Sequence, residues 1–177
     1  MSATVSRILA ELADREAIRE LLLRYCRASD RADEASLAAV YWPDAHDDHL
    51  AFSGTAAEFV AWALPNLRAM RFNHHHVGNM LIAIDGRRAE AETYFLGYHS
   101  VPGEDGARRD SFSGGRYLDK LEKRGDEWRI LRRLVVVDWF RELPDTQFFD
   151  LGPFGMPVPR GDLAPEDPSY AFFEFLR

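Results

Sequence analysis

The stretch G-G-R-Y-L-D-K-L-E-K-R-G-D-E-W-R-I, residues 114–130, decides the fold class because it joins two strand patterns through a tight turn. The turn is Arg124-Gly125-Asp126, and the runs on either side predict strands over about 111–123 and 127–140. The same tripeptide is an integrin-binding sequence, but a hairpin turn accounts for it fully. Within the second strand, Leu134 to Val137 is apolar at every position, as expected where both faces of a sheet are covered.

A second hairpin precedes this one. Residues 74–84 and Arg88–Ser100 alternate in character, and Asp85-Gly86 between them is a turn signal. Six residues of the later strand share one face, opposite Glu90 and Glu92: Ala89, Ala91, Thr93, Phe95, Gly97 and His99.

Helical periodicity dominates the first third of the chain. Residues 5–29 predict a long helix, Asp33 is an N-cap for a short second helix that Pro43 stops, and Ser53-Gly54-Thr55 opens a third. Between them, the acidic and histidine-rich stretch Asp44–His49 predicts a short strand or a loop. Three helices followed by a run of antiparallel strands predict an α+β fold, with the helices packed on one face of a curved sheet.

The length of 177 residues suits one domain, which we expect to span residues 1–140. The tail, residues 141–177, holds six of the nine prolines and six phenylalanines and cannot be one regular element. We expect this extension to pack on the domain or onto a neighbouring subunit.

Charge and cysteine content exclude several classes of partner. The formal net charge is -7 with no basic stripe, so we expect neither nucleic acid nor a membrane as partner. Cys26 is the only cysteine, which rules out an intrachain disulfide and fits a reducing compartment. The N-terminal residues lack the uninterrupted apolar core of a signal peptide. These features predict a soluble, cytoplasmic protein.

Two candidate site residues lie at the end of the first predicted helix. Asp30 follows that helix, where the negative end of the helix dipole disfavours a carboxylate. Asp30 is therefore either a functional group or an ordinary carboxylate in a solvated loop. Tyr25 lies one turn earlier on the apolar face, as either an ordinary core aromatic or a pocket group.

The triplet His74-His75-His76 suggests a metal site, but neighbours on a strand point to opposite faces. Residues 47–49 offer further ligands, yet no spacing matches a metal motif, and we expect no metal. His76 shares its predicted face with Met80 and Ile82, so it points at an apolar interior as a satisfied core group or as a pocket base.

Three further polar residues lie on predicted strands. His99 lies on the Ala89–Phe95 face, and Asp138 alternates with Leu134 and Val136, which predicts a carboxylate in an apolar layer. An ionised carboxylate there needs a partner, for which Arg116 is a candidate. The sequence has no glycine-rich phosphate loop, nucleotide fingerprint or nucleophile elbow, so any chemistry relies on acid–base side chains.

The stretches R-E-A-I-R-E-L-L-L-R-Y-C-R-A-S-D-R (15–31), H-H-H-V-G-N (74–79) and 114–130 resemble SnoaL-like proteins of the nuclear transport factor 2-like superfamily. The resemblance covers about residues 8–140 and implies a cone-shaped, curved antiparallel sheet, an α+β barrel, with three N-terminal helices packed against it. The superfamily contains enzymes, binding proteins and assembly subunits, so the fold alone does not give the activity.

Among these enzymes, the pattern is most similar to scytalone dehydratase, bile acid 7α-dehydratase and hexachlorocyclohexane dehydrochlorinase. The resemblance implies that Asp30 matches their aspartate and His76 their histidine. Tyr25 matches a pocket tyrosine of the bile acid enzyme, and His99 loosely matches a second histidine of scytalone dehydratase. Asp138 falls near an arginine of the bile acid enzyme, a departure that puts that substrate in doubt.

The implied reaction is a cofactor-free β-elimination, with loss of water ahead of loss of halide. His76 would abstract a proton, Asp30 would orient the imidazole, and Tyr25 or His99 would polarise the departing oxygen or a carbonyl. Neither a metal nor an organic cofactor is required.

The predicted pocket walls favour a small hydrophobic, cyclic substrate. The residues expected to line the pocket are Met80, Phe95, Arg116, Asp138 and Trp139. Two other functions fit the same pattern. One is an isomerase that shifts a double bond in a ketone. The other is a non-catalytic ligand-binding or assembly domain, like the small subunits of ring-hydroxylating dioxygenases. Family membership implies a homodimer or homotrimer.

Overall fold

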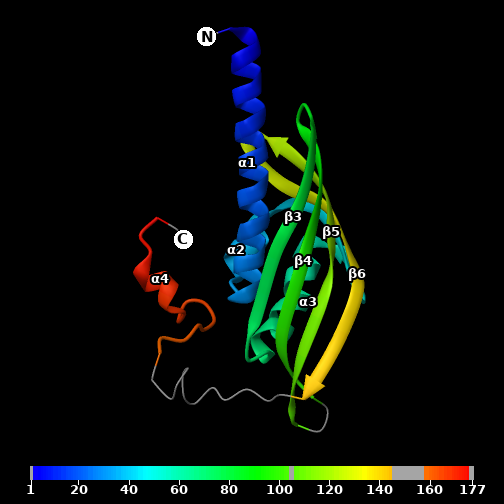
Figure 1. Ribbon diagram of the computed structural model, residues 1–177, viewed down its shortest axis with the longest axis vertical. Helices are drawn as coiled ribbons and strands as arrows, with labels where there is room; N and C mark the ends of the chain where they lie inside the picture. Colours follow the sequence, from blue (N-terminus) through cyan, green and yellow to red (C-terminus); the bar gives the residue numbers. More distant parts are fainter. Residues whose placement is uncertain (1, 104–105, 145–157, 176–177) are drawn as a thin grey trace.

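The computed structural model describes residues 2–103, 106–144 and 158–175. These residues form four helices and six strands (Figure 1). In chain order the elements are α1 (Ala3–Asp30), α2 (Glu34–Ala39), β1 (Tyr41–His49), β2 (Phe52–Thr55), α3 (Ala56–Ala69), β3 (Asn73–Asp85), β4 (Arg88–Pro102), β5 (Arg108–Arg124), β6 (Glu127–Pro144) and α4 (Pro168–Phe172).

The six strands form one curved, unclosed sheet in the order β2-β1-β6-β5-β4-β3 (Figure 1). Four of the neighbouring pairs are antiparallel, whereas β1 and β6 run parallel. Helix α1 packs along β3, and α3 packs against β1. The predicted α+β class is therefore confirmed, but the sheet is mixed rather than wholly antiparallel. The connection from β1 to β6 runs through α3 and four strands, and its length allows β6 to lie parallel to β1.

Local sequence signals explain where the elements begin and turn. The Asp33 carboxylate accepts a hydrogen bond from the Ser36 amide at 3.1 Å and caps α2 as predicted. Thr55 caps α3 in a capping box with Glu58. Gly86 and Gly125 adopt φ values of +60° and +61° in the two predicted hairpin turns. Helix α2 ends at Ala39 rather than at Pro43, which lies within β1.

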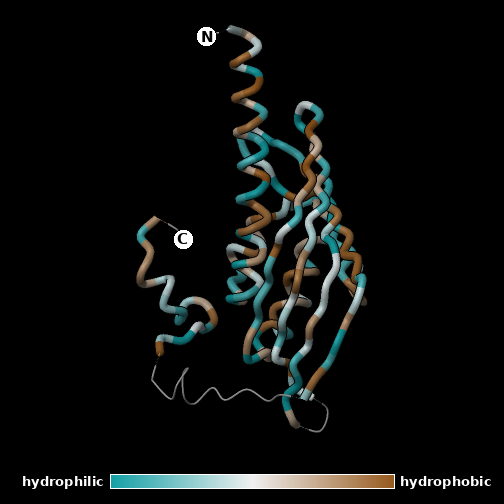
Figure 2. Tube along the Cα trace, viewed as in Figure 1, coloured by the Kyte–Doolittle hydropathy of each residue, from teal (hydrophilic) through white to brown (hydrophobic). Residues whose placement is uncertain are grey.

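The core lies between the helices and the inner face of the sheet. Ile18 and Leu22 of α1 pack there with Leu37 of α2 and with Leu121 and Ile130 from the central strands. The first turns of α1 extend beyond the sheet, and Figure 2 shows apolar residues along that projecting segment. No helix among the described residues is long and apolar enough to cross a membrane.

The described part of the tail contacts the end of α1 through polar groups. The Tyr170 hydroxyl donates to the Asp33 carboxylate at 2.7 Å, and Arg31 forms an ion pair with Asp167 at 3.0 Å. Phe172 and Phe175 are 82% and 92% exposed, so these phenylalanines do not make the contact. Strand β6 continues to Pro144, and the boundary at residue 140 stays a prediction. Phe148, Phe149 and Phe154 lie outside the described residues.

Candidate functional site

A cavity of about 440 Å³ lies between α1, α3 and the inner face of the sheet. Its walls are mainly apolar, with Phe59 of α3, Phe95 of β4 and Phe140 of β6 among them. Its polar lining includes three histidines and three tyrosine or serine hydroxyls: His49, His75, His99, Tyr25, Ser29 and Tyr117. A volume of this size and character suits a small apolar ligand with a few polar groups.

An aspartate–histidine pair lies at one wall of this cavity. Nδ1 of His75 is 2.7 Å from Oδ1 of Asp30, and the two side chains are only 10% and 11% exposed. The His75 backbone amide also donates to Asp30, at 3.0 and 3.2 Å to its two oxygens. Because the carboxylate accepts the Nδ1 proton, Nε2 of a neutral His75 carries the lone pair of a base. Helix α1 supplies the carboxylate from its last residue, and β3 supplies the imidazole.

The expectation that His76 pairs with Asp30 is wrong, because β3 contains a bulge. Val77 pairs with Phe95 and Met80 pairs with Thr93, so three steps along β3 match two steps along β4. The extra residue reverses the alternation. Residues 73, 75 and 77 turn inward before the bulge, and 80, 82 and 84 turn inward after it, so His76 is exposed.

His99 lies beside the pair, with its ring centroid 5.0 Å from that of His75. Its Nδ1 is 3.1 Å from Oδ1 of Asn73, whose amide nitrogen donates to the Leu67 carbonyl. That second bond fixes the amide orientation, so His99 must donate from Nδ1 and keeps Nε2 as an acceptor. Burial, reinforced by the charges of His75 and His49, lowers the pKa of His99 to about 3. His99 is therefore a neutral acceptor at neutral pH.

Tyr25 forms part of the cavity floor and is 2% exposed. Burial raises the pKa of its hydroxyl, so Tyr25 stays protonated and is available as a donor. The Arg133 guanidinium lies 3.9 Å from the Tyr25 ring centroid and 4.4 Å from that of Tyr117. This cation, paired with Asp119, holds the two rings from below.

Four of the five residues expected to line the pocket lie elsewhere. Phe95 lines the cavity, whereas Met80 is partly buried and packs against the hydrophobic core. Arg116 and Asp138 form the expected ion pair, at 3.1 Å, but the pair lies on the exposed face of the sheet. Trp139 packs over Gly114 and is 49% exposed. Two bulges in β6 explain the outward positions of Asp138 and Trp139. Leu121 pairs with Ile130 and Lys120 pairs with Arg132, which turns the even-numbered residues 132–138 outward, and Gly114 pairs with Trp139 while Gly115 pairs with Val137, which turns Trp139 outward as well.

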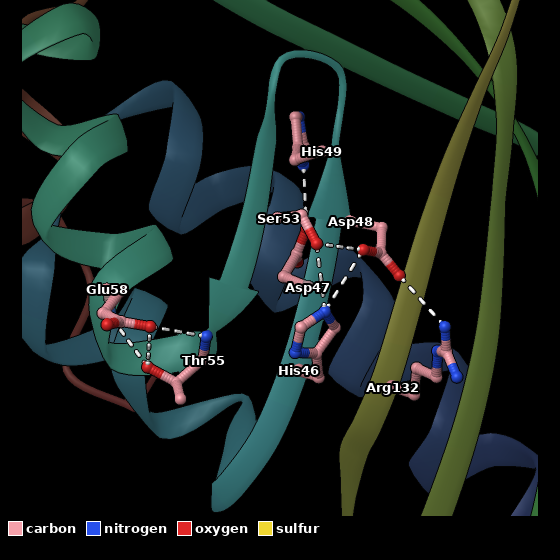
Figure 3. Close-up of polar contacts among 8 residues, drawn as sticks. All are labelled: His46, Asp47, Asp48, His49, Ser53, Thr55, Glu58 and Arg132. Atoms are coloured by element: carbon pink, nitrogen blue, oxygen red, sulfur yellow. Dashed lines mark hydrogen bonds and ion pairs between the residues drawn. The ribbon is translucent and has the colours of Figure 1, made fainter.

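A second aspartate–histidine pair lines the cavity from β1, and sequence reasoning considered it only as a source of metal ligands. Nδ1 of His49 is 3.3 Å from Oδ1 of Asp47, which is fully buried (Figure 3). The Tyr41 hydroxyl donates to the other oxygen of Asp47 at 2.6 Å. The i, i+2 spacing of these two residues on a strand is the signal that would have placed them on one face.

His46 and Asp48 alternate with that pair and lie on the other side of the strand (Figure 3). His46 Nε2 is 3.1 Å from Asp48 Oδ1, and the Ser53 hydroxyl donates to the same oxygen at 2.6 Å. In a nucleophilic triad one ring nitrogen of the histidine contacts the serine and the other contacts the aspartate. Here Nε2 of His46 contacts both Asp48 and Ser53, so the three residues do not form such a triad. In the part of the chain that the structure describes, no group of three or more His, Cys, Asp or Glu side chains is arranged to hold a metal ion.

Comparisons with known proteins place this geometry in a family. Residues 10–134 match the model of the SnoaL-like domain. The uncharacterized protein Rv2910c of Mycobacterium tuberculosis is 29% identical over 129 residues, covering 71% of this chain and 86% of that protein.

Solved structures share the fold. One is a protein from Novosphingobium aromaticivorans with the provisional name scytalone dehydratase (TM-score 0.67, 21% identity, 86% of this chain and 97% of that chain). Another is the hexachlorocyclohexane dehydrochlorinase LinA-type3 of Novosphingobium barchaimii (TM-score 0.70, 19% identity, 79% and 97%). With a family model matched over most of its length and this fold, the chain belongs to the SnoaL-like family of the nuclear transport factor 2-like superfamily.

Proposed function

We propose that this protein is a cofactor-free lyase that catalyses β-elimination on a small, largely apolar cyclic substrate. The observation that carries the proposal is the 2.7 Å contact between Asp30 and His75 at the wall of an apolar cavity. A base with this support, shielded from water, is suited to remove a weakly acidic proton next to a carbonyl.

In the proposed step, Nε2 of His75 takes the proton from the carbon next to the carbonyl. The electron pair of that C–H bond forms the new double bond, and the leaving group departs with the electrons of its own bond. Asp30 keeps the imidazole in the required tautomer and stabilises the imidazolium that forms. Tyr25, protonated at the cavity floor, donates to the carbonyl oxygen as negative charge develops there.

The names of two structural neighbours support this reaction class. One is called a dehydrochlorinase and the other is provisionally called a dehydratase, and both names describe eliminations. Their sequence identities of 19% and 21% support a shared fold, so the reaction itself is our inference from the site.

The test is an elimination assay that needs no knowledge of the natural substrate. We would incubate the protein with β-aryloxycyclohexanones, which release a chromogenic phenol on elimination, and compare His75→Gln with His76→Gln. His76 is the matched control because it is the next residue on β3 but faces outward. Loss of the base should lower kcat/KM by about 10²–10⁴-fold, whereas His76→Gln should match the wild type.

Two results would contradict the proposal. Equal rates for the wild type and His75→Gln would remove His75 as the base. A protein that releases no phenol but converts a β,γ-unsaturated cyclic ketone to its conjugated isomer would be an isomerase, because the same base then returns the proton to a different carbon.

A further inference from the structure

The buried ionisable side chains beneath the cavity include one more carboxylate than they include guanidinium groups. Asp47 and Asp119 are both fully buried, and so is Arg133, which lies opposite Asp47 in the register of β1 and β6. Arg133 uses Nε and Nη2 to bind both oxygens of Asp119, at 2.7 and 2.8 Å. The cluster therefore holds two carboxylates and one guanidinium, and a buried net charge of this kind is costly.

His49 is the group that can supply the missing charge. Its ion pair with Asp47 is the only one that Asp47 makes within the part of the chain that the structure describes. Oδ1 of Asp47 and Nδ1 of His49 both lack any better-aligned hydrogen-bond partner there. An imidazolium at His49 would leave the cluster neutral. Asp30 differs, because it is partly exposed and also accepts from a backbone amide.

The fold brings His49 and His75 to one cavity from strands toward opposite edges of the sheet. Strand β1 lies near one edge of the sheet and β3 forms the other, and the curvature turns both toward the interior (Figure 1). The His49 ring stacks on Phe59, with centroids 4.8 Å apart, and lies against Trp62, which fixes its orientation. Nδ1 contacts Asp47, so Nε2 is the nitrogen that His49 can offer to a ligand in the cavity that it lines.

We propose that His49 is the general acid of this site and protonates the leaving oxygen, which selects a hydroxyl or ether oxygen rather than a halide as the leaving group. This inference rests on the proposed function. As the C–H bond breaks toward His75, the C–O bond breaks and its electron pair takes the Nε2 proton of His49. The products are the unsaturated ketone and water or an alcohol, and proton exchange with solvent returns both histidines to their starting states. Halide leaves without a proton and needs no such donor.

The experiment measures how the elimination rate depends on the leaving group. β-Aryloxycyclohexanones are compared across phenols from the acidic nitrophenol to the weakly acidic methoxyphenol. With an acid present the rate depends weakly on phenol acidity, because the enzyme supplies the proton. His49→Gln should lose the least activity on the nitrophenyl ether, because nitrophenolate leaves readily without a proton. The same variant should lose about 10²–10⁴-fold with the methoxyphenyl ether.

Two further variants control for structure. His46→Gln changes the other histidine of β1, which also pairs with an aspartate but lies outside the cavity, and it should behave as the wild type on every ether. Asp47→Asn leaves the His49 side chain in place but removes the carboxylate that would stabilise a protonated imidazole. The elimination rate of this variant should therefore depend more steeply on phenol acidity, as for His49→Gln. Asp47→Asn also carries the test if His49→Gln does not fold, which thermal unfolding followed by circular dichroism would reveal.

The outcomes separate this inference from the proposed function. The role of His49 would be overturned if the elimination rate depended on phenol acidity equally in the wild type and in the His49 or Asp47 variant. If His75→Gln were also slow on every ether, the proposed elimination would still stand. If the wild type releases none of the phenols, the proposed function fails and this inference fails with it.

Discussion

Two arginine–aspartate pairs join β5 to β6, and they differ in which face of the sheet they occupy. Asp119 and Arg133 meet on the inner face at 2.7 Å, with both side chains fully buried. Arg116 and Asp138 meet at 3.1 Å on the outer face, with side chains 28% and 42% exposed. The chemistry of the two pairs is the same, but only the inner guanidinium also lies beneath the Tyr25 ring at the cavity floor.

The different exposure of the two pairs implies different contributions to stability. A buried pair is poorly screened and cannot be replaced by water, so removing one partner leaves an uncompensated charge. An exposed ion pair adds little to the free energy of unfolding, because water solvates each charge almost as well as the partner does. We therefore expect the inner pair to hold the cavity floor in place, and the outer pair to contribute little to either the fold or the site.

The largest effect is expected from breaking the inner pair. Asp119→Asn leaves Arg133 buried without its counter-charge and should lower the free energy of unfolding by about 3–5 kcal/mol. Asp138→Asn makes the same chemical change on the outer face, and its urea unfolding curve should superimpose on that of the wild type. Equal destabilisation in the two variants would contradict the distinction between the faces.

A buried group without a counter-charge gives a second test. His99 is bonded to an amide, and burial lowers its pKa to about 3 from the ordinary 6.5. The unfolded chain thus takes up a proton below pH 6.5 that the folded chain does not. Stability from this source is complete above pH 6.5 and is lost as the pH falls toward 3, with a slope of up to about 1.4 kcal/mol per pH unit. The slope should be flatter in His99→Gln, measured by urea unfolding across this range.

Two glycines allow the tightness of packing on the inner and outer faces of the sheet to be compared. A Cβ at Gly115 would collide with the Val136 carbonyl oxygen and touch the Phe95 ring, whereas a Cβ at Gly78 would meet nothing. Gly115→Ala should lower the free energy of unfolding by about 1–3 kcal/mol through overpacking. Gly78→Ala should leave it nearly unchanged. A tolerated Gly115→Ala would mean that the inner face is looser than its packing indicates.

The smallest effect concerns the tail. Tyr170→Phe removes the hydrogen bond to the Asp33 carboxylate, which should weaken docking of α4 by about 1 kcal/mol. Exchange of the Phe173 amide, which donates to the Ser169 carbonyl in α4, should become about fivefold faster. Phe172→Ala is the control, because that side chain is exposed and its loss should leave the exchange rate unchanged.

Most of the fold followed from local signals, and the errors in the site have one physical cause. The caps of α2 and α3 and both hairpin turns are set by residues close in sequence, so they were predicted correctly. The bulges in β3 and β6 depend on pairing with β4 and β5, and no local pattern revealed them. Each bulge shifts the alternation by one residue. Because these shifts were not foreseen, the prediction named His76 instead of His75 and placed Asp138 on the inner face.

The parallel pairing of β1 with β6 has the same origin, since it depends on contacts between segments far apart in sequence. It also explains why Asp47 and His49 were not recognised as cavity residues. A strand or loop prediction for residues 44–49 could not give the direction of their side chains, which depends on the register with β6.

The three consecutive histidines at the start of β3 have a consequence for mutational tolerance. Asp30 binds one of them through its imidazole and through a backbone amide that any residue supplies. If a single-residue insertion or deletion in β3 shifted this segment by one position, His74 or His76 would take the place of His75. The histidine that contacts Asp30 thus has another histidine on either side in the sequence, and we expect β3 to tolerate the gain or loss of one residue at the bulge with a histidine still beside Asp30.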